Sequence, residues 1–451
     1  MNFYTMKMIC GKDGTQSPQS IKKFVEQRGI VGIGEPEETQ GSGTFQNSIQ
    51  IGDIVVLRQP FALLKIKSGP MQYQGDNDFP DFNWLCIIRQ VEVLSWHEEE
   101  EIQNDGDFYF NAQGYQATCA KIEKPDKLTV VTKWLDVIQG TKMKKDLSKL
   151  LLEVYNLILT GAPGTGKTYL AQEIAREITS KNISSTQKQS IGFVQFHPSY
   201  DYTDFVEGLR PKPLSDKDGN IGFVRQDGVF KNFCKEALKN PDDKFVFIID
   251  EINRGDIAKI FGELFFAIDP GYRDEENPTP IKTQYQNLIP IDSEDPFKDG
   301  FIVPKNIYII GTMNDIDRNV ESMDFAIRRR FTWQEIEPVN NTLMWDDVKS
   351  GIGNFKEQAQ ITMKAINNAI TGIEGLGSQY QLGAAYFLKL KNYNGNFTML
   401  WERHIAHLMH EYLRGIPRAD EHFNALKKVW FDSLLPMNNS NSEASESQTE
   451  I

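Results

Sequence analysis

The chain has few cysteines and no long apolar run. Its four cysteines never stand in C-x-x-C spacing: they are Cys10, Cys86, Cys119 and Cys234. This scatter argues against a structural zinc site or a disulfide framework, and it is typical of a reducing compartment. No apolar run reaches the ~18 residues of a membrane span, and the first residues lack a charged stretch followed by an apolar one. We therefore expect a cytoplasmic protein.

An excess of basic residues is also missing. The formal net charge is −13 over 451 residues, so any contact with DNA must come from a local patch and not from overall attraction. Residues 1–145 hold 16 basic and 19 acidic residues, including the acidic run Glu98–Glu101, and they do not form a basic DNA clamp. The length suggests two or three domains.

A glycine-rich loop near the centre of the chain carries the clearest chemistry. Its residues fit the pattern G-x-x-x-x-G-K-[ST], in which backbone N–H groups cradle phosphates, the lysine reaches the β- and γ-phosphates, and the hydroxyl binds Mg²⁺. A short apolar run, Leu157–Leu159, precedes the loop, and helix-forming residues follow, so phosphates would lie at a helix N-terminus. We predict that a nucleoside triphosphate contacts Gly161, Ala162, Pro163, Gly164, Thr165, Gly166, Lys167, Thr168 and Tyr169.

Two carboxylates end a second apolar run. Phe245–Ile249 suits a buried parallel strand that delivers Asp250 and Glu251 at its carboxyl end. Phosphoryl transfer depends mainly on positioning and on charge neutralisation. We therefore expect Asp250 to hold Mg²⁺ together with Thr168, and Glu251 to orient and polarise the attacking water.

A third apolar run, Ile307–Met313, ends at Asn314, which would touch the γ-phosphate or its water. Three arginines, at positions 328–330, then stand at the end of a predicted helix. A run of surface charge is one interpretation. After a strand that ends in asparagine, however, the cluster has the form of an arginine finger, and we expect Arg328 or Arg329 to act on a neighbouring subunit's nucleotide.

The remaining segments give broader predictions. Short β-branched runs separated by Gly, Pro and Asp predict a small barrel or a strongly bent sheet within residues 1–145. Its expected strands are Ile30–Ile33, Ile51–Leu57, Leu63–Ile66, Trp84–Ile88 and Val91–Leu94. Aromatic side chains could line a pocket for a flipped base or could be ordinary core residues. They are Tyr73, Phe79, Phe82, Trp84 and Trp96.

Hydrophobic periodicity and turn residues predict the elements of the rest of the chain. Leu147–Val154 predicts a short amphipathic helix at the domain boundary, and the segment between Pro211 and Phe230 predicts a surface hairpin or loop. Phe355–Ile370 and Leu400–Leu413 predict amphipathic helices. Three histidines within the second helix lack carboxylate or cysteine partners, so we expect a structural role for them. They are His404, His407 and His410.

The ordered motifs closely resemble the McrB family of AAA+ motor subunits in modification-dependent, McrBC-type restriction systems. The resemblance runs from about residue 150 to 430 and rests on five segments: Gly161–Thr168, Phe196–Tyr200, Ile249–Asp256, Gly311–Asn314 and Ala326–Phe331. The family signature Met-Asn-Thr-Ala-Asp-Arg reads here Met313-Asn314-Asp315-Ile316-Asp317-Arg318, with Thr and Ala replaced. By this resemblance Asp317 and Arg318 join the catalytic set. The segment around Gly52–Val55 more weakly resembles PUA/EVE-like barrels that hold a modified base.

The resemblance implies an α/β fold with four parts. These are a β-rich recognition domain (1–145), a AAA+ parallel-sheet nucleotide-binding core (146–338), a helical lid (339–436) and a disordered tail (437–451). It implies GTP, or ATP, as substrate with Mg²⁺, a homo-oligomeric and hexameric ring, and translocation on double-stranded DNA with a modified base. This chain has no convincing nuclease constellation, so cleavage would belong to a separate McrC-like nuclease subunit.

Two other functions are compatible with the same motifs. One is a AAA+ ATPase of the chaperone or remodelling type, in which the N-terminal domain binds protein; DNA-stimulated hydrolysis would discriminate against it. The other is a module that binds modified bases under the control of a nucleotide and whose motor is vestigial. The intact set of Lys167, Asp250, Glu251 and Asn314 argues against the second, and measurable turnover would exclude it.

Overall fold

A computed structural model gives the fold. It describes residues 2–8, 17–34, 41–58, 61–97, 119–180, 190–213, 221–273, 279–290, 292–316, 325–338, 341–345 and 350–435. The chain divides into two compact units, Met1–Thr141 and Lys142–Ile451. None of the helices in the described ranges combines the length and the apolar character that a membrane crossing requires.

The N-terminal unit is built on a curled, mostly antiparallel sheet. Within the described part of this unit the strands pair in the order β2-β6-β4-β3-β1-β7, and β5 pairs with β6. The β-rich sheet expected from the sequence is therefore confirmed. The elements are β1 (Phe3–Met6), α1 (Pro18–Arg28), β2 (Ile30–Ile33), β3 (Ile54–Leu57), β4 (Phe61–Ile66), β5 (Met71–Gln72), β6 (Ile87–His97) and β7 (Cys119–Lys121).

The aromatic side chains considered for a base pocket lie in and around the core of this unit. Phe82 is 1% exposed and stacks on Phe24 of α1 with ring centroids 4.1 Å apart. Phe79 meets Phe24 edge-on, and the Arg28 guanidinium lies over the Phe79 ring. Tyr73, Trp84 and Trp96 are partly buried against the same core. Phe82 therefore packs as a core aromatic and presents no free ring face to a base.

A single long helix, α3 (Pro125–Val154), contains the division between the two units. Its Val131 and Trp134 are buried with strands of the N-terminal unit, whereas its Leu147 and Leu151 are buried with the second unit. The short helix predicted at Leu147–Val154 is therefore only the last part of α3. Because the apolar face changes its neighbours along the helix, no single amphipathic pattern marks its full length.

The second unit begins with a parallel sheet. Among the described residues, five parallel strands form it in the order β14-β8-β13-β12-β9. This confirms the expected parallel-sheet core. The elements are β8 (Asn156–Thr160), α4 (Lys167–Thr179), β9 (Ile191–Gln195), α5 (Tyr202–Phe205), β10 (Glu207–Pro213), β11 (Ile221–Asp227), α6 (Val229–Lys239), β12 (Phe245–Asp250), α7 (Ile257–Phe261), α8 (Leu264–Ala267), β13 (Ile307–Thr312), α9 (Phe325–Arg328) and β14 (Thr332–Glu335).

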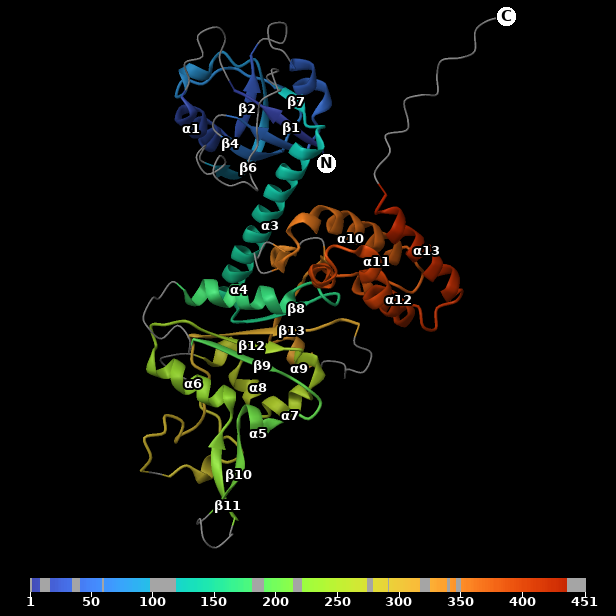
Figure 1. The fold of residues 1–451 in the computed structure, drawn as a ribbon. Coiled ribbons are helices and arrows are strands. Elements are labelled where there is room, and N and C mark those ends of the chain that lie inside the picture. Colours follow the sequence, from blue (N-terminus) through green and yellow to red (C-terminus); the bar gives the residue numbers. More distant parts are fainter. Residues whose placement is uncertain are drawn as a thin grey trace, which may run out of the picture. The chain divides into compact units, whose positions relative to one another are not determined.

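Helices cover both faces of this sheet, as Figure 1 shows. In β12, Val246 and Ile248 are buried on the α4 side, and Phe247 is buried on the opposite side with α6, α7 and α8. Successive side chains of a strand point to opposite faces, so a central strand between two helical layers must be apolar throughout. This explains the uninterrupted apolar run that precedes Asp250.

Strands β10 and β11 form a separate antiparallel ribbon that projects from the sheet (Figure 1). At its base the fully buried Lys231 of α6 donates to Glu207 Oε2 at 2.6 Å, and Arg225 donates to the same oxygen at 2.7 Å. Burial alone would raise the pKa of Glu207, but hydrogen bonds from Lys231 and other groups outweigh it, and the pKa lies below its ordinary value. These buried ion pairs fix the ribbon to the core.

The last described part of the second unit is helical, as expected. Its helix α12 places His410 against the Phe423 ring, and His404 just before it bonds to the Tyr393 hydroxyl at 2.8 Å. Within the described residues no group of three or more His, Cys, Asp or Glu side chains could hold a metal. The elements are α10 (Lys356–Thr371), a 3₁₀ helix (Ala384–Tyr393), α11 (Phe397–Leu400), a π-helix (Trp401–Ile405), α12 (Ala406–Tyr412) and α13 (Ala419–Asp432).

Some predicted elements differ from the structure. Trp84–Ile88 and Val91–Leu94 were expected as two strands, but a single strand, β6, begins at Ile87 and continues through Val91–Leu94, and Trp84–Cys86 lie before it outside any strand. Arg89, between the two expected strands, is buried and donates to the carbonyls of Phe45 and Ser68. A polar residue inside an apolar run mimics a break when only the sequence is considered. The acidic run Glu98–Glu101, Cys10 and the tail 437–451 lie outside the described residues.

Candidate functional site

The glycine-rich loop joins β8 to α4 at the carboxyl edge of the sheet. Gly161, Gly164 and Gly166 adopt φ values of +134°, +75° and +80°, which residues with a side chain rarely adopt. At Gly161 an added Cβ would also lie 2.5 Å from the Ile336 carbonyl oxygen of the neighbouring chain segment. The loop therefore needs glycine for both its conformation and its packing.

Lys167 is the first residue of α4, and it is buried within the loop. Its Nζ donates to the carbonyl oxygens of Gly161 at 2.9 Å and Ala162 at 2.8 Å, and it lies 3.3 Å from Thr165 Oγ1. The ammonium is thus held in the concave side of the loop by the loop's own oxygens. A buried ammonium at a helix N-terminus, where the first backbone N–H groups have no partner within the helix, is an arrangement that attracts anions.

Asp250, at the end of β12, connects the loop to the centre of the sheet. Its Oδ1 accepts hydrogen bonds from Thr168 Oγ1 at 2.6 Å and from Thr312 Oγ1 at 2.7 Å. The hydroxyl oxygen of Thr168 and the carboxylate oxygen of Asp250 are metal ligands of the hard, oxygen type that Mg²⁺ prefers. Mg²⁺ commonly binds one or two carboxylates together with substrate phosphates. The predicted pair of Thr168 and Asp250 is therefore brought together with suitable chemistry.

Glu251 follows Asp250 in an unusual backbone conformation. Its φ is +51° and its ψ is +47°, a left-handed geometry that costs a residue with a side chain on the order of 1 kcal/mol or more. Asn314 Nδ2 donates to Glu251 Oε1 at 2.7 Å, and Arg254 Nε lies 3.2 Å from Oε2. Both carboxylate oxygens therefore have a positive or donor group beside them, and the predicted Glu251 and Asn314 lie in direct contact.

The three arginines have different environments. Arg328 and Arg329 are exposed, and the Arg328 guanidinium lies 5.5 Å from the centre of the Trp333 ring. Arg330 is only partly exposed and lies over the Phe265 ring, while its carbonyl accepts from Asn156. Arg328 and Arg329 are therefore accessible at the surface of this unit, whereas Arg330 packs against Phe265. Asp317 and Arg318 fall within residues 317–324, outside the described part of the chain.

Sequence reasoning did not identify the contacts that the C-terminal helical part makes with the loop. Asn341 is fully buried and donates to the Thr165 carbonyl at 2.6 Å. Gly383 N–H donates to the Pro163 carbonyl at 3.2 Å, and a Cβ at position 383 would lie 2.0 Å from the Gly164 carbonyl carbon. The glycine within Gln381–Phe387 was the available signal, because backbone can approach this closely only where Cβ is absent.

Thr312 and Asp315, which flank Asn314 in the sequence, were also missed. Thr312 bridges the two strand ends, because its hydroxyl donates to Asp250 and also accepts from the Glu251 N–H at 3.3 Å. The pKa of Asp315 is raised mainly by burial, while the charge of Lys167 acts in the opposite direction. Both residues lie in segments that carry the family resemblance, Gly311–Asn314 and Met313–Arg318, but sequence reasoning assigned neither of them a role.

Comparison with protein families places this site in a known domain. Residues 156–331 match the family described as AAA domain (dynein-related subfamily). The match begins at β8 and ends one residue before β14, so it includes the loop, Asp250, Glu251, Asn314 and the arginines.

Two curated relatives are similar over much of the same region. The Type IV methyl-directed restriction enzyme EcoKMcrB subunit of Escherichia coli (strain K12) is 37% identical over 254 residues, which is 55% of this chain and 50% of that protein. The Type II restriction enzyme BsuMI component YdiS of Bacillus subtilis (strain 168) is 30% identical over 204 residues, 40% of this chain and 57% of that protein. This chain thus spans about half the length of the curated relatives it matches.

A crystal structure of Protein Atu2648 from Agrobacterium tumefaciens aligns with 30% of this chain and 92% of its own. Its identity is 11% and its TM-score is 0.18, values too low to support a common fold. The PUA/EVE-like character expected for the N-terminal unit therefore stays a prediction.

Proposed function

We propose that this McrB-like AAA+ protein is the nucleoside-triphosphate-hydrolysing motor of a restriction complex. Its AAA domain and its likeness to components of two restriction enzymes support the proposal. The observation that carries it is the cluster at the carboxyl edge of the parallel sheet, where Lys167, Asp250 and Glu251 meet around the glycine-rich loop. Ligands of open parallel sheets bind at this edge.

In the proposed mechanism the loop N–H groups and Lys167 bind the β- and γ-phosphates. Phosphate oxygens would take over the hydrogen bonds that Lys167 now gives to the Gly161 and Ala162 carbonyls. Thr168 and Asp250 would hold Mg²⁺, which neutralises the negative charge of the phosphates when bound. Tyr169 follows in the first turn of α4, partly buried against the C-terminal helical part, and would lie near the same phosphates.

The attacking water is assigned to Glu251. Its carboxylate would accept the hydrogen bond that orients the water, and Asn314 and Arg254 hold that carboxylate by its two oxygens. The left-handed backbone conformation of Glu251 supports a catalytic role, because strained backbone conformations are retained where function requires a side chain to point in one fixed direction. A positioned acid–base group of this kind contributes about 10²- to 10⁴-fold to a rate.

A neighbouring subunit completes the site in this proposal. Arg328 and Arg329 are exposed at the end of a short helix and would stabilise the transition-state charge on the nucleotide of the adjacent copy in a hexameric ring. Asp317 and Arg318, assigned by family resemblance, remain part of the proposed catalytic set. Hydrolysis would then require assembly.

The substrate DNA and the partner are inferred from the relatives. The Escherichia coli relative is named as a methyl-directed enzyme, which supports double-stranded DNA with a modified base as the ligand of this complex. An McrC-like nuclease would supply cleavage, and GTP or ATP would supply energy for translocation. Turnover of the full chain with GTP and with ATP should rise when a duplex with modified cytosine is added. Equal turnover with modified, unmodified and no DNA would contradict DNA-directed function and favour a protein-remodelling role.

A further inference from the structure

Strand β9 forms one edge of the parallel sheet. It pairs with β12, and no strand pairs with its other side within the described part of the chain. Ser190 and Phe196 make backbone hydrogen bonds to β12, and alternate residues of a strand bond to the same side. Ile191, Phe193 and Gln195 therefore turn their N–H and C=O groups outward. An open edge of this kind is a template for another strand.

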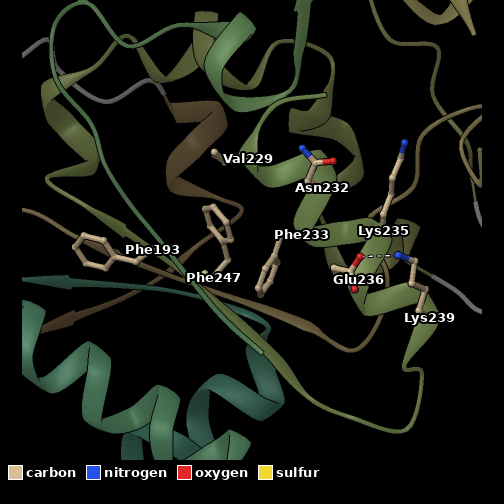
Figure 2. A pocket seen from close by; sticks show the side chains of 9 residues that line it. Phe193, Val229, Asn232, Phe233, Lys235, Glu236, Lys239 and Phe247 are labelled. Atoms are coloured by element: carbon tan, nitrogen blue, oxygen red, sulfur yellow. Dashed lines mark hydrogen bonds and ion pairs between the residues drawn. The ribbon is translucent and has the colours of Figure 1, made fainter. Parts of the chain in front are cut away.

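A large hollow opens between this edge and α6. It has a volume of about 620 Å³, and Figure 2 shows Phe193 on one side of the Phe233 and Phe247 rings and polar side chains of α6 on the other. Gly192 contributes its backbone to the lining, and a Cβ at this position would lie 2.4 Å from the Phe247 ring. Glycine here keeps the apolar floor of the hollow open.

A smaller hollow lies on the opposite face of the same edge. It has a volume of about 250 Å³ and is lined by Ile191, Phe193 and Ile248, with Gln172 and Arg176 of α4 at its side. Phe193 lines both hollows and is 49% exposed, which is unusual for a phenylalanine in a strand. The two hollows thus flank one free strand edge from above and below the sheet.

The charged side chains around the hollows already have partners. Lys235 bonds to Asp227 and Asp295 at the base of the ribbon, and Lys239 pairs with Glu236 at 2.6 Å. Arg176 pairs with Glu173 in α4. Because these cations are neutralised locally, the surface offers little attraction for phosphate, and it does not suit a nucleic acid or a nucleotide. Its apolar floors suit apolar side chains.

We propose that the β9 edge binds an extended apolar segment of a partner protein by strand addition. The segment's backbone would pair with the outward groups of Ile191, Phe193 and Gln195. Its alternate side chains point to opposite faces, so a bulky one would enter the large hollow and its immediate neighbours would enter the small one. This site is separate from the nucleotide site and does not depend on hydrolysis.

A peptide library identifies the preferred segment. Random nonapeptides displayed on phage are selected on the full chain and counter-selected on its Phe193→Asp variant. Enriched sequences should place a large apolar residue between smaller aliphatic ones and should lack proline in that stretch. The control variant Ile51→Asp removes another exposed apolar side chain, 67% exposed in the N-terminal unit, and should retain full binding.

Backbone methylation then distinguishes strand addition from simple apolar adhesion. Single N-methyl groups are placed at successive positions of the most enriched nonapeptide. Affinity should fall about tenfold at alternate positions, where the N–H faces β9, and should change little at the positions between them. The Lys167→Ala variant should bind the same peptide as well as the wild type, so failure of the proposed motor function would not remove this result.

Three outcomes would overturn the proposal. The first is that no nonapeptide is enriched on the full chain over the Phe193→Asp variant. The second is that N-methylation weakens binding equally, or not at all, along the peptide. The third is that Phe193→Asp lowers the molecular mass of the assembly without any peptide, which would make the β9 edge an interface between copies of this chain.

Discussion

The side-chain amide of Asn314 donates a hydrogen bond of 2.7 Å to Glu251 Oε1, joining the ends of two neighbouring parallel strands. Glu251 follows β12 and Asn314 follows β13, and their residues lie 63 positions apart in the chain. Thr312 adds a second link, since its hydroxyl contacts both Asp250 and the Glu251 N–H. The sheet edge thus orients the carboxylate that we assign to the attacking water.

Replacing Asn314 with alanine should lower turnover about a hundredfold, the usual loss when one fixed donor is removed from a catalytic centre. Nucleotide affinity should change little, because Asn314 contacts the carboxylate and not the glycine-rich loop. Steady-state turnover and binding of a fluorescent nucleotide measure the two effects separately. The control Asn368→Ala alters an exposed asparagine of α10 and should have neither effect. An unchanged turnover in Asn314→Ala would remove Asn314 from the mechanism.

The Arg328→Ala, Arg329→Ala double variant should bind nucleotide normally and hydrolyse it poorly, because a finger supplied in trans cannot serve its own nucleotide. Mixing it with an Asp250→Ala, Glu251→Gln variant should restore part of the activity at mixed interfaces. Arg414→Ala, at an exposed arginine of the helical part, is the matched control. The trans assignment fails if dilute monomer hydrolyses at the full rate of the assembly.

Gly383→Ala should weaken nucleotide binding about tenfold, equivalent to about 1.4 kcal/mol, because the added methyl would lie 2.0 Å from the Gly164 backbone. The helical segment must then move away from the loop that binds the phosphates. Gly353→Ala is a suitable control, since a Cβ there would meet nothing within 4 Å. Calorimetric titration with nucleotide measures both variants, and equal affinities would show that the contact has no bearing on binding.

Glu207→Gln should destabilise the second unit by about 3 kcal/mol, because it removes the negative charge bonded directly to the buried Lys231, whose next carboxylate oxygen, on Asp227, lies 3.8 Å away. The pKa of Glu207 is lower in the folded protein than in an unfolded chain, so its contribution is present above the unfolded pKa. That contribution is lost as the pH falls below about 4 and through the folded pKa. Urea unfolding as a function of pH measures this loss.

The wild type should lose this stability on acidification, whereas Glu207→Gln should lack that part of the pH dependence. The control Glu402→Gln changes an exposed glutamate and should unfold as the wild type does. Parallel curves for the wild type and Glu207→Gln down to pH 3 would contradict the assigned role of the ion pair.

The sequence predicted the nucleotide core well because its signals are local. The spacing of residues in Gly161–Thr168 predicts where one strand ends and which residues follow it. The apolar run before Asp250 does the same for a second strand. The family match confirms the AAA+ domain that these patterns implied. Parallel strands place such ends at one edge of the sheet, so Glu251 and Asn314 could be expected near each other from their positions alone.

Long-range packing was not visible in the sequence. The contacts of Asn341 and Gly383 with the loop join segments more than 170 residues apart, and no local pattern encodes them. Nothing in three consecutive arginines distinguishes Arg330, which packs on Phe265, from its exposed neighbours. The ion pair of Glu207 and Lys231 likewise depends on burial that composition does not reveal.

Release of phosphate from GTP and from ATP in the presence of Mg²⁺ tests the central claim most directly. The full chain should hydrolyse at least one of the two nucleotides. Glu251→Gln should bind that nucleotide but hydrolyse it at least about 10²-fold more slowly, since the amide keeps the shape and cannot polarise water. The control Glu411→Gln, at an exposed glutamate of α12, should match the wild type. Wild-type turnover by Glu251→Gln would contradict the assignment of this site as the hydrolytic centre.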